Sequence, residues 1–174
     1  MVRNSFISKL PKTDLHVHLD GSLRETTLHE LAEQFAYDTP EGVFKERYGS
    51  LEDYLRGFEF TCAVMRDEHS IARIAYELCA DAFNEGVYYQ EIRFAPQLLE
   101  YHGLTSQQIL TAAGAGIAKA EAEFNDGNQI DLYRASIIVC AMRFPEQFAS
   151  KSVVAVRSAI EARDVLGLPI VGFD

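Results

Sequence analysis

The sequence predicts an α/β fold built on a parallel sheet. Two observations predict this fold: four short runs of β-type residues, and amphipathic helical patterns in the stretches between them. Strands that alternate with helices form βαβ units, and the crossovers between their parallel strands are right-handed. A length of 174 residues, 48% of them hydrophobic, suits one globular domain. We therefore expect residues 1–174 to lie in one domain without an internal boundary.

The four expected strands are short and rich in β-branched or aromatic residues. In chain order they are Thr13–Leu19, Val87–Phe94, Tyr133–Met142 and Pro169–Phe173. No helical pattern follows the fourth run, although parallel sheets are normally covered by helices. The pattern is typical of an α/β fold that is interrupted after its fourth strand.

Three helices are expected between the first two strands. Ser22 followed by Glu25 has the pattern of a capping box, so we expect a helix to start there. The range Leu51–Met65 is helical but less regular, and it follows a looser stretch, 37–50, that contains proline and glycine. The clearest helix is 70–84, where apolar residues recur at helical spacing.

The later helices carry start and stop signals. Thr105 with Gln108 forms a second capping-box pattern, followed by an apolar stripe that ends at Phe124. The last helix is expected to start near Pro145, a favourable residue in a first turn, and to end at Gly167.

Composition excludes several classes of protein. The net charge is −10, so a nucleic-acid partner is not expected, because phosphate binding requires a basic surface. No apolar run reaches the ~18 residues of a membrane helix, so no membrane partner is expected, and no secretory signal is visible. Three cysteines without a CxxC pair favour a reduced, cytoplasmic setting. Cys140 lies in an apolar run, which predicts a position in the core.

The residues that point to chemistry lie in the first expected strand. Side chains alternate along a strand, so a regular strand places hydrophobic and polar residues on opposite faces. One face would carry Leu15, Val17 and Leu19, and the other would carry Asp14, His16, His18 and Asp20. Two imidazoles two residues apart can reach one divalent ion such as zinc. This cluster stands at the carboxyl end of a strand, where parallel α/β folds place their sites.

Other polar residues receive structural interpretations. Glu91 and Arg93 share a face of the second strand and are expected to form a buried ion pair. His29, His69 and His102 are assigned to a helix, a helix start and a loop, and none of them to a metal. No glycine-rich phosphate-binding motif occurs, and the sequence lacks the signature of the cytidine-type zinc deaminases.

The run Leu10–Ser22 resembles the opening motif of the adenosine deaminase family, within the metal-dependent amidohydrolase superfamily. Further stretches also resemble this family. They are Leu51–Phe60, Ile71–Glu77, Glu85–Pro96, Ile137–Arg143 and Val171–Asp174. The resemblance spans nearly the whole chain and covers about the first half of a family member. It implies the first half of a (β/α)8 TIM-type barrel, whose full length is typically ~250 residues.

The resemblance also implies an activity, the hydrolytic deamination of adenosine or deoxyadenosine to inosine or deoxyinosine. By resemblance, His16 and His18 are two ligands of one zinc ion, and Asp20 contacts the sugar of the nucleoside. Leu55 and Phe58 belong to an apolar lid over the substrate, although core packing explains their spacing equally well.

In this family the catalytic glutamate, histidine and aspartate and the remaining metal ligands lie on later strands. No catalytic residue is therefore assigned within the chain, and the chain alone is expected to be inactive. Open sheet edges lead us to expect a C-terminal half as partner, or self-association. Two alternatives stay open: a deaminase of adenine or another aminopurine, and a non-catalytic half-barrel that binds or assembles with other proteins.

Overall fold

The computed structural model of the chain describes residues 6, 9–38, 49–127, 132–142 and 147–174. Within these ranges four strands form one parallel sheet in the order β1-β2-β3-β4. The strands are β1 (Lys12–His18), β2 (Val87–Phe94), β3 (Arg134–Val139) and β4 (Ile170–Phe173). The predicted parallel sheet is confirmed, and only the third run is clearly shorter than expected.

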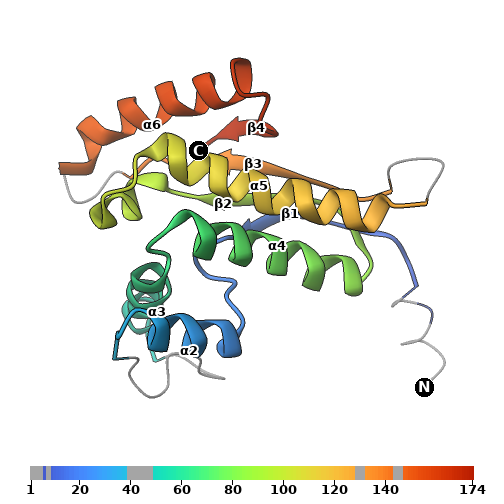
Figure 1. Ribbon diagram of the computed structural model, residues 1–174, viewed down its shortest axis with the longest axis horizontal. Coiled ribbons are helices and arrows are strands. Elements are labelled where there is room, and N and C mark those ends of the chain that lie inside the picture. Colours follow the sequence, from blue (N-terminus) through green and yellow to red (C-terminus); the bar gives the residue numbers. More distant parts are fainter. Residues whose placement is uncertain (1–5, 7–8, 39–48, 128–131, 143–146) are drawn as a thin grey trace.

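Helices cover one face of the sheet. Three long helices lie next to one another in Figure 1, the middle one in front of the strands, while two more lie together below them. The three are α4 (Glu68–Asn84), α5 (Ser106–Asn125) and α6 (Gln147–Asp164), and the other two are α2 (Glu25–Gln34) and α3 (Leu51–Val64). Two short 3-10 turns, η1 (Pro96–Leu98) and η2 (Glu100–His102), follow β2. The hydrophobic core lies between the sheet and the three long helices and extends to α2 and α3.

Two helices begin at capping boxes. Thr105 caps α5 as predicted: its hydroxyl accepts from the Gln108 amide, and the Gln108 side chain accepts from the Thr105 amide. The same reciprocal arrangement joins Asp67 and Ser70 at the start of α4. The sequence prediction placed the start of α4 slightly late, because Ser70 acts inside the box and not before it.

The capping box predicted at Ser22 is wrong. The hydroxyl of Ser22 donates to the carbonyl oxygen of His18 at 2.6 Å, and α2 begins only after Arg24, which makes no side-chain cap. The hydroxyl therefore closes the turn that follows β1 instead of capping a helix. The predicted start of the last helix at Pro145 lies outside the described residues, as does most of the looser stretch 37–50. The helix ends at Asp164, slightly before the predicted Gly167, whose φ of 67° is typical of a residue just beyond a helix.

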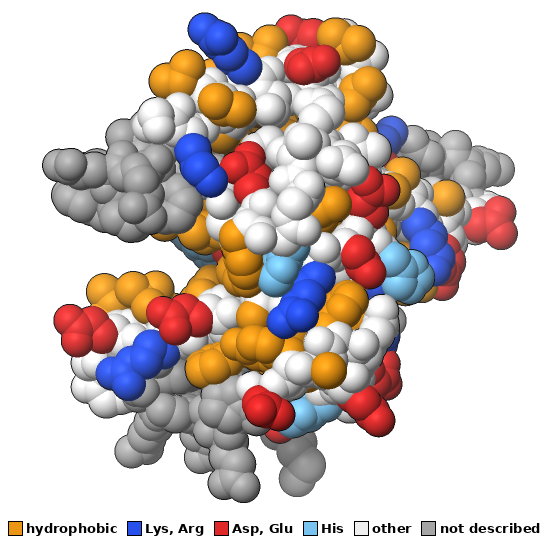
Figure 2. All heavy atoms as spheres, turned by 60° about the vertical axis from the view of Figure 1, so that its left-hand side comes forward, with side chains coloured by type: hydrophobic (Ala, Val, Ile, Leu, Met, Phe, Trp, Pro, Cys, Tyr) orange, Lys and Arg blue, Asp and Glu red, His pale blue; other side chains and the backbone are white. Residues whose placement is uncertain are grey.

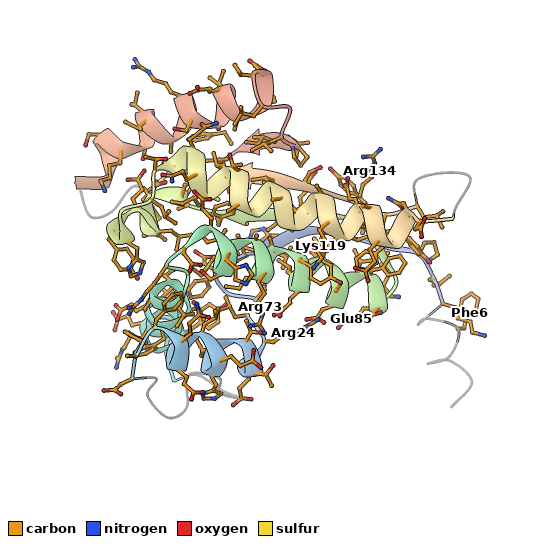
Figure 3. All side chains as sticks on the ribbon, viewed as in Figure 1. Phe6, Arg24, Arg73, Glu85, Lys119 and Arg134 are labelled. Carbon is orange, nitrogen blue, oxygen red and sulfur yellow. The ribbon has the colours of Figure 1, made fainter. Side chains whose placement is uncertain are left out.

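A polar network joins α2 to α4 on the outer side of the fold. The buried carboxylate of Glu77 accepts from the Thr27 hydroxyl at 2.5 Å and from Arg73 Nε at 2.8 Å. Arg24 reaches Glu77 at 3.9 Å and forms a bidentate pair with Asp81. Figure 3 shows Arg24 and Arg73 next to each other between the two helices. The network fixes the position of α2, and with it the turn that leaves β1.

The cysteines are free, and Cys62 and Cys79 are buried. Cys140 is only half-buried, so its predicted core position is wrong in part. It follows directly after the last residue of β3, where the chain leaves the sheet. Among the residues the structure describes, no helix is both long and apolar enough to cross a membrane.

Substitution of Glu77 is expected to destabilise the fold. Glu77→Ala leaves the buried Thr27 hydroxyl and the Arg73 guanidinium without their shared acceptor, which costs about 2 kcal/mol of unfolding free energy. Urea unfolding of the native polypeptide measures this loss, with Glu33→Ala on the exposed side of α2 as the control. Equal stability of the two variants would contradict the role assigned to the network.

Exposed apolar side chains on the two outer strands are expected to cause self-association of the isolated chain. Leu15 of β1 is 54% exposed and Val171 of β4 is 56% exposed, on strands that each lack one neighbour in the described sheet. Light scattering of the 174-residue chain should show oligomers, and Val171→Lys should reduce them more than Val154→Lys on α6. A stable monomer would disprove this expectation.

Candidate functional site

A β-bulge shapes the strand that carries the two histidines. Along β1, Asp14 pairs with Gln90 and Val17 with Ile92, so β1 holds one more residue than β2 between these pairs. The amide of His16 donates to the carboxylate of Asp14 at 3.0 Å within the bulge. The strict alternation predicted from the sequence is therefore interrupted, and Leu15 is exposed whereas Leu19 is fully buried. Bulges are frequent beside active sites because they re-aim side chains.

The two predicted zinc ligands and the predicted sugar contact lie together at the end of β1. The rings of His16 and His18 have their centroids 5.4 Å apart. His18 Nδ1 lies 3.7 Å from Asp20 Oδ1, and Asp20 is only 4% exposed. Asp20 Oδ1 is buried and has no hydrogen-bond partner among the described residues. A buried, unpaired carboxylate oxygen next to two imidazoles is an acceptor ready for a ligand.

Helix α3 closes over this cluster through Phe58. The Phe58 ring meets the His18 ring edge-on at a centroid distance of 6.1 Å. A Cβ atom on Gly21 would lie 2.8 Å from the Phe58 ring, so only glycine fits at that position without displacing the ring. The Gly21 that follows the polar cluster thus allows α3 to approach it closely.

Both predicted lid residues line one pocket. Leu55 and Phe58 of α3 form part of the wall of a pocket of about 700 Å³. The other lining residues come from α3, from the 3-10 turns after β2 and from α6. They are Glu59, Cys62, Gln97, Leu98, Tyr101 and Lys151. Figure 2 shows this side of the molecule hollowed, with hydrophobic side chains along the hollow.

Gln97 is a pocket residue that sequence reasoning missed. It lies in η1, directly after the carboxyl end of β2, and is 2% exposed. Within the described ranges, neither polar atom of its side-chain amide has a hydrogen-bond partner. The rule that parallel folds place sites just beyond strand ends could have identified it, because Pro96 marks the end of the second strand.

The predicted pair of Glu91 and Arg93 does not form. Arg93 instead pairs with Asp174 at 2.8 Å and donates to the carbonyl oxygen of Leu15 at 3.2 Å, while Glu91 accepts from the Tyr89 hydroxyl at 2.9 Å. Partners on β1 and β4 are available to Arg93 because the strands end together at this edge. Burial, and secondarily Asp174, raises the pKa of the nearby Cys140 thiol to about 11, so this thiol is protonated at neutral pH.

The other histidines stay away from the cluster. His29 is exposed on α2 at 3.9 Å from Glu25, and His69 is exposed in the first turn of α4. His102 in η2 is half-buried, and burial, followed by Arg66, lowers its pKa. In the ranges that the structure describes, no group of three or more histidine, cysteine or acidic side chains could hold a metal ion.

The donors at the end of β1 fit part of a zinc site. Neutral imidazole nitrogens are common zinc ligands, and catalytic zinc sites use three protein ligands and one open position. His16 and His18 supply two nitrogen donors, and the unpaired oxygen of Asp20 supplies an acceptor beside them. The residues present therefore suit a zinc ion that takes further ligands from elsewhere.

Comparison with known proteins points to one family. Residues 11–174 match the family described as adenosine deaminase. The chain is 42% identical to an adenosine deaminase of Shewanella woodyi, over 70% of the chain. It is 32% identical to an adenosine deaminase of Enterococcus faecalis, over 99% of the chain. A probable adenosine deaminase of Dictyostelium discoideum is 33% identical over 95% of the chain. The chain spans 40%, 50% and 22% of the lengths of these three relatives, respectively.

Solved structures share the fold. Arabidopsis ADAL complexed with IMP matches with a TM-score of 0.79 and 25% identity, over 98% of the chain and 50% of that structure. A Burkholderia ambifaria amidohydrolase with bound Zn matches with a TM-score of 0.78 and 22% identity, over 97% of the chain and 44% of that structure. The four parallel strands and their helices thus correspond to about half of these larger folds.

Removal of the two imidazoles is expected to weaken zinc binding. The double variant His16→Ala/His18→Ala should lower the zinc affinity of the native polypeptide at least about tenfold, because it removes two of the usual three protein ligands. Competition with a chelating dye measures the affinity, with the exposed His29→Ala as the control. An unchanged affinity in the double variant would place the metal elsewhere.

Proposed function

Because the chain belongs to the adenosine deaminase family, we propose that the native polypeptide carrying it is a zinc-dependent hydrolase of purine nucleosides. The reaction converts adenosine or deoxyadenosine and water into inosine or deoxyinosine and ammonia. The observation that carries the proposal is the convergence of His16, His18 and the buried carboxylate of Asp20 next to Phe58, which also lines a mostly apolar pocket.

His16 and His18 would hold the metal with their ring nitrogens, together with ligands from other parts of the polypeptide. A bound zinc ion lowers the pKa of a water molecule toward ~7 and so supplies a nucleophile at neutral pH. The T-shaped contact with Phe58 holds the His18 ring in place. Leu55 and Phe58 of α3 give the site an apolar wall on this side.

Asp20 would bind the sugar. Its buried Oδ1 accepts no hydrogen bond from any part of the chain that the structure describes, so a sugar hydroxyl that donates to it would satisfy this acceptor. Leu55 and Phe58 would cover the nucleoside as the apolar lid, a role that fits their place in the wall of the pocket.

A nucleoside monophosphate is the second candidate substrate. The Arabidopsis structures similar to this chain are described as complexes with IMP or GMP, and as an N6-mAMP deaminase. The carboxylate of Asp20 argues against a phosphate here, because two negative charges near each other in a partly desolvated site repel strongly. Adenine or another aminopurine stays a further alternative.

We further propose that residues 1–174 form the N-terminal portion of a single barrel domain in a cytoplasmic protein of purine metabolism. The remainder of the barrel would come from a C-terminal half, or from a second copy of the chain. The share of the relatives and solved structures that the chain covers supports this arrangement.

The activity test is the release of ammonia from adenosine, deoxyadenosine, adenine and AMP by the zinc-loaded native polypeptide. We expect the highest kcat/KM with adenosine and deoxyadenosine. Failure to deaminate any of the four compounds would refute the proposal and favour the alternative of a non-catalytic binding or assembly protein.

Asp20→Asn is expected to change the substrate preference. A hydrogen bond to a charged acceptor is worth about 1.5–3 kcal/mol, so kcat/KM for adenosine should fall about 10- to 100-fold. The kcat/KM for AMP should fall less or rise, because the repelling charge is removed. Asp38→Asn, at an exposed position after α2, is the control. An equal loss for both substrates would contradict the assigned role of Asp20.

A further inference from the structure

The side-chain amide of Gln97 is buried but makes no hydrogen bond to the described residues, which is unusual. Its backbone is fixed in η1, where the Leu98 amide donates to Ala95 at 3.0 Å and the Leu99 amide donates to Pro96 at 2.9 Å. The residue is 2% exposed, and both the oxygen and the nitrogen of its amide lack partners among the residues that the structure describes. Buried polar groups are nearly always paired, so an unpaired one calls for an explanation such as a missing ligand.

The position of Gln97 supplies that explanation. Gln97 lines the same pocket as the lid residues Leu55 and Phe58. Most of the wall is apolar, and the cation at the wall, Lys151, is already paired with Glu100 at 3.3 Å. Gln97 therefore places a buried amide, unpaired among the described residues, at the wall of a mostly apolar pocket, and small-molecule sites usually combine an apolar lining with a few polar groups.

The geometry indicates which part of a nucleoside would reach this amide. The base must lie at the end of β1, where His16 and His18 stand. Phe58 touches His18 on one side and lines the pocket on the other, so the part of the ligand that extends past Phe58 is the sugar. Sugar hydroxyls both donate and accept, which complements an amide that carries one acceptor oxygen and two donor hydrogens.

We propose that Gln97 is a specificity-determining residue whose side-chain amide hydrogen-bonds the sugar hydroxyls of the bound nucleoside. This inference rests on the proposed function. The amide atoms are covered in the structure, so the side chain turns about its own bonds to face the ligand. The turn breaks no hydrogen bond, because the amide has none in the protein to lose.

The test compares the binding of inosine and of hypoxanthine, which share the base and differ by the sugar, to the native polypeptide by calorimetry. Gln97→Met keeps the length of the side chain and removes the amide. We expect inosine to bind about three- to tenfold more weakly to this variant, with unchanged binding of hypoxanthine. Thermal stability should stay equal or rise, because an unpaired buried amide is removed.

Gln107→Met is the matched control. Gln107 in α5 also has both amide atoms buried without partners, but it does not line the pocket. Its substitution should leave the affinity for inosine unchanged. If Gln97→Met binds inosine as tightly as the unaltered protein does, or weakens hypoxanthine equally, the inference is wrong. If the unaltered protein binds neither compound, the proposed function itself fails and this inference fails with it.

A second measurement needs no variant. In a spectrum of the side-chain amides, inosine should shift the resonances of Gln97 and leave those of Gln107 in place, and hypoxanthine should shift neither. If the chemical shifts of the Gln97 amide stay unchanged at saturating inosine, the assignment is wrong. This test holds even if the Gln97→Met protein does not fold.

Discussion

The guanidinium of Arg93 joins three strands at the edge of the sheet where the candidate site lies. From β2 it donates to the Leu15 carbonyl oxygen in the bulge of β1 and pairs with Asp174 just after β4. The bulge carries His16, so the direction of that imidazole depends on where Arg93 holds the backbone beside it. The other site residues lie close to Arg93 along the chain fold. His18 is the register partner of Arg93 in the sheet, and Asp20 follows in the turn after β1, with its carboxylate 3.7 Å from the His18 ring.

The turn after β1 connects the histidine strand to the lid residue Phe58. Ser22 closes the turn onto the His18 carbonyl oxygen, and Gly21 leaves room for the Phe58 ring. The network around Glu77 then fixes α2 against α4, so the chain that leaves β1 is held at both ends. The contacts of Glu77 lie outside the site, yet they hold the turn that carries Asp20 and Gly21 in position.

Local patterns predicted most of the elements, because they depend on residues near one another in the sequence. The periodicity of the helix at 70–84 and the capping box at Thr105 are examples. The site residues His16, His18 and Asp20 were identifiable from one short motif, and the structure places them together. Their roles as ligands and as a sugar contact stay predictions.

Features that depend on pairing between distant segments were not predictable. The bulge in β1 requires knowledge of its register with β2, and the partner of Arg93 lies 81 residues away along the chain. Ser22 was assigned to a cap because its spacing to Glu25 fits, although its hydroxyl has a nearer acceptor in the folded turn. The unpaired amide of Gln97 is visible only when the pocket is known.

The most direct test of the account is an anomalous-diffraction map at the zinc edge, from crystals of the native polypeptide grown with zinc and inosine. The account predicts one strong peak about 2.0–2.1 Å from a ring nitrogen of each of His16 and His18. It also predicts that the inosine sugar contacts Asp20 and extends past Phe58 toward Gln97 in the pocket. A zinc peak that contacts neither histidine, with inosine bound elsewhere, would contradict the assignment of this strand end as the active site.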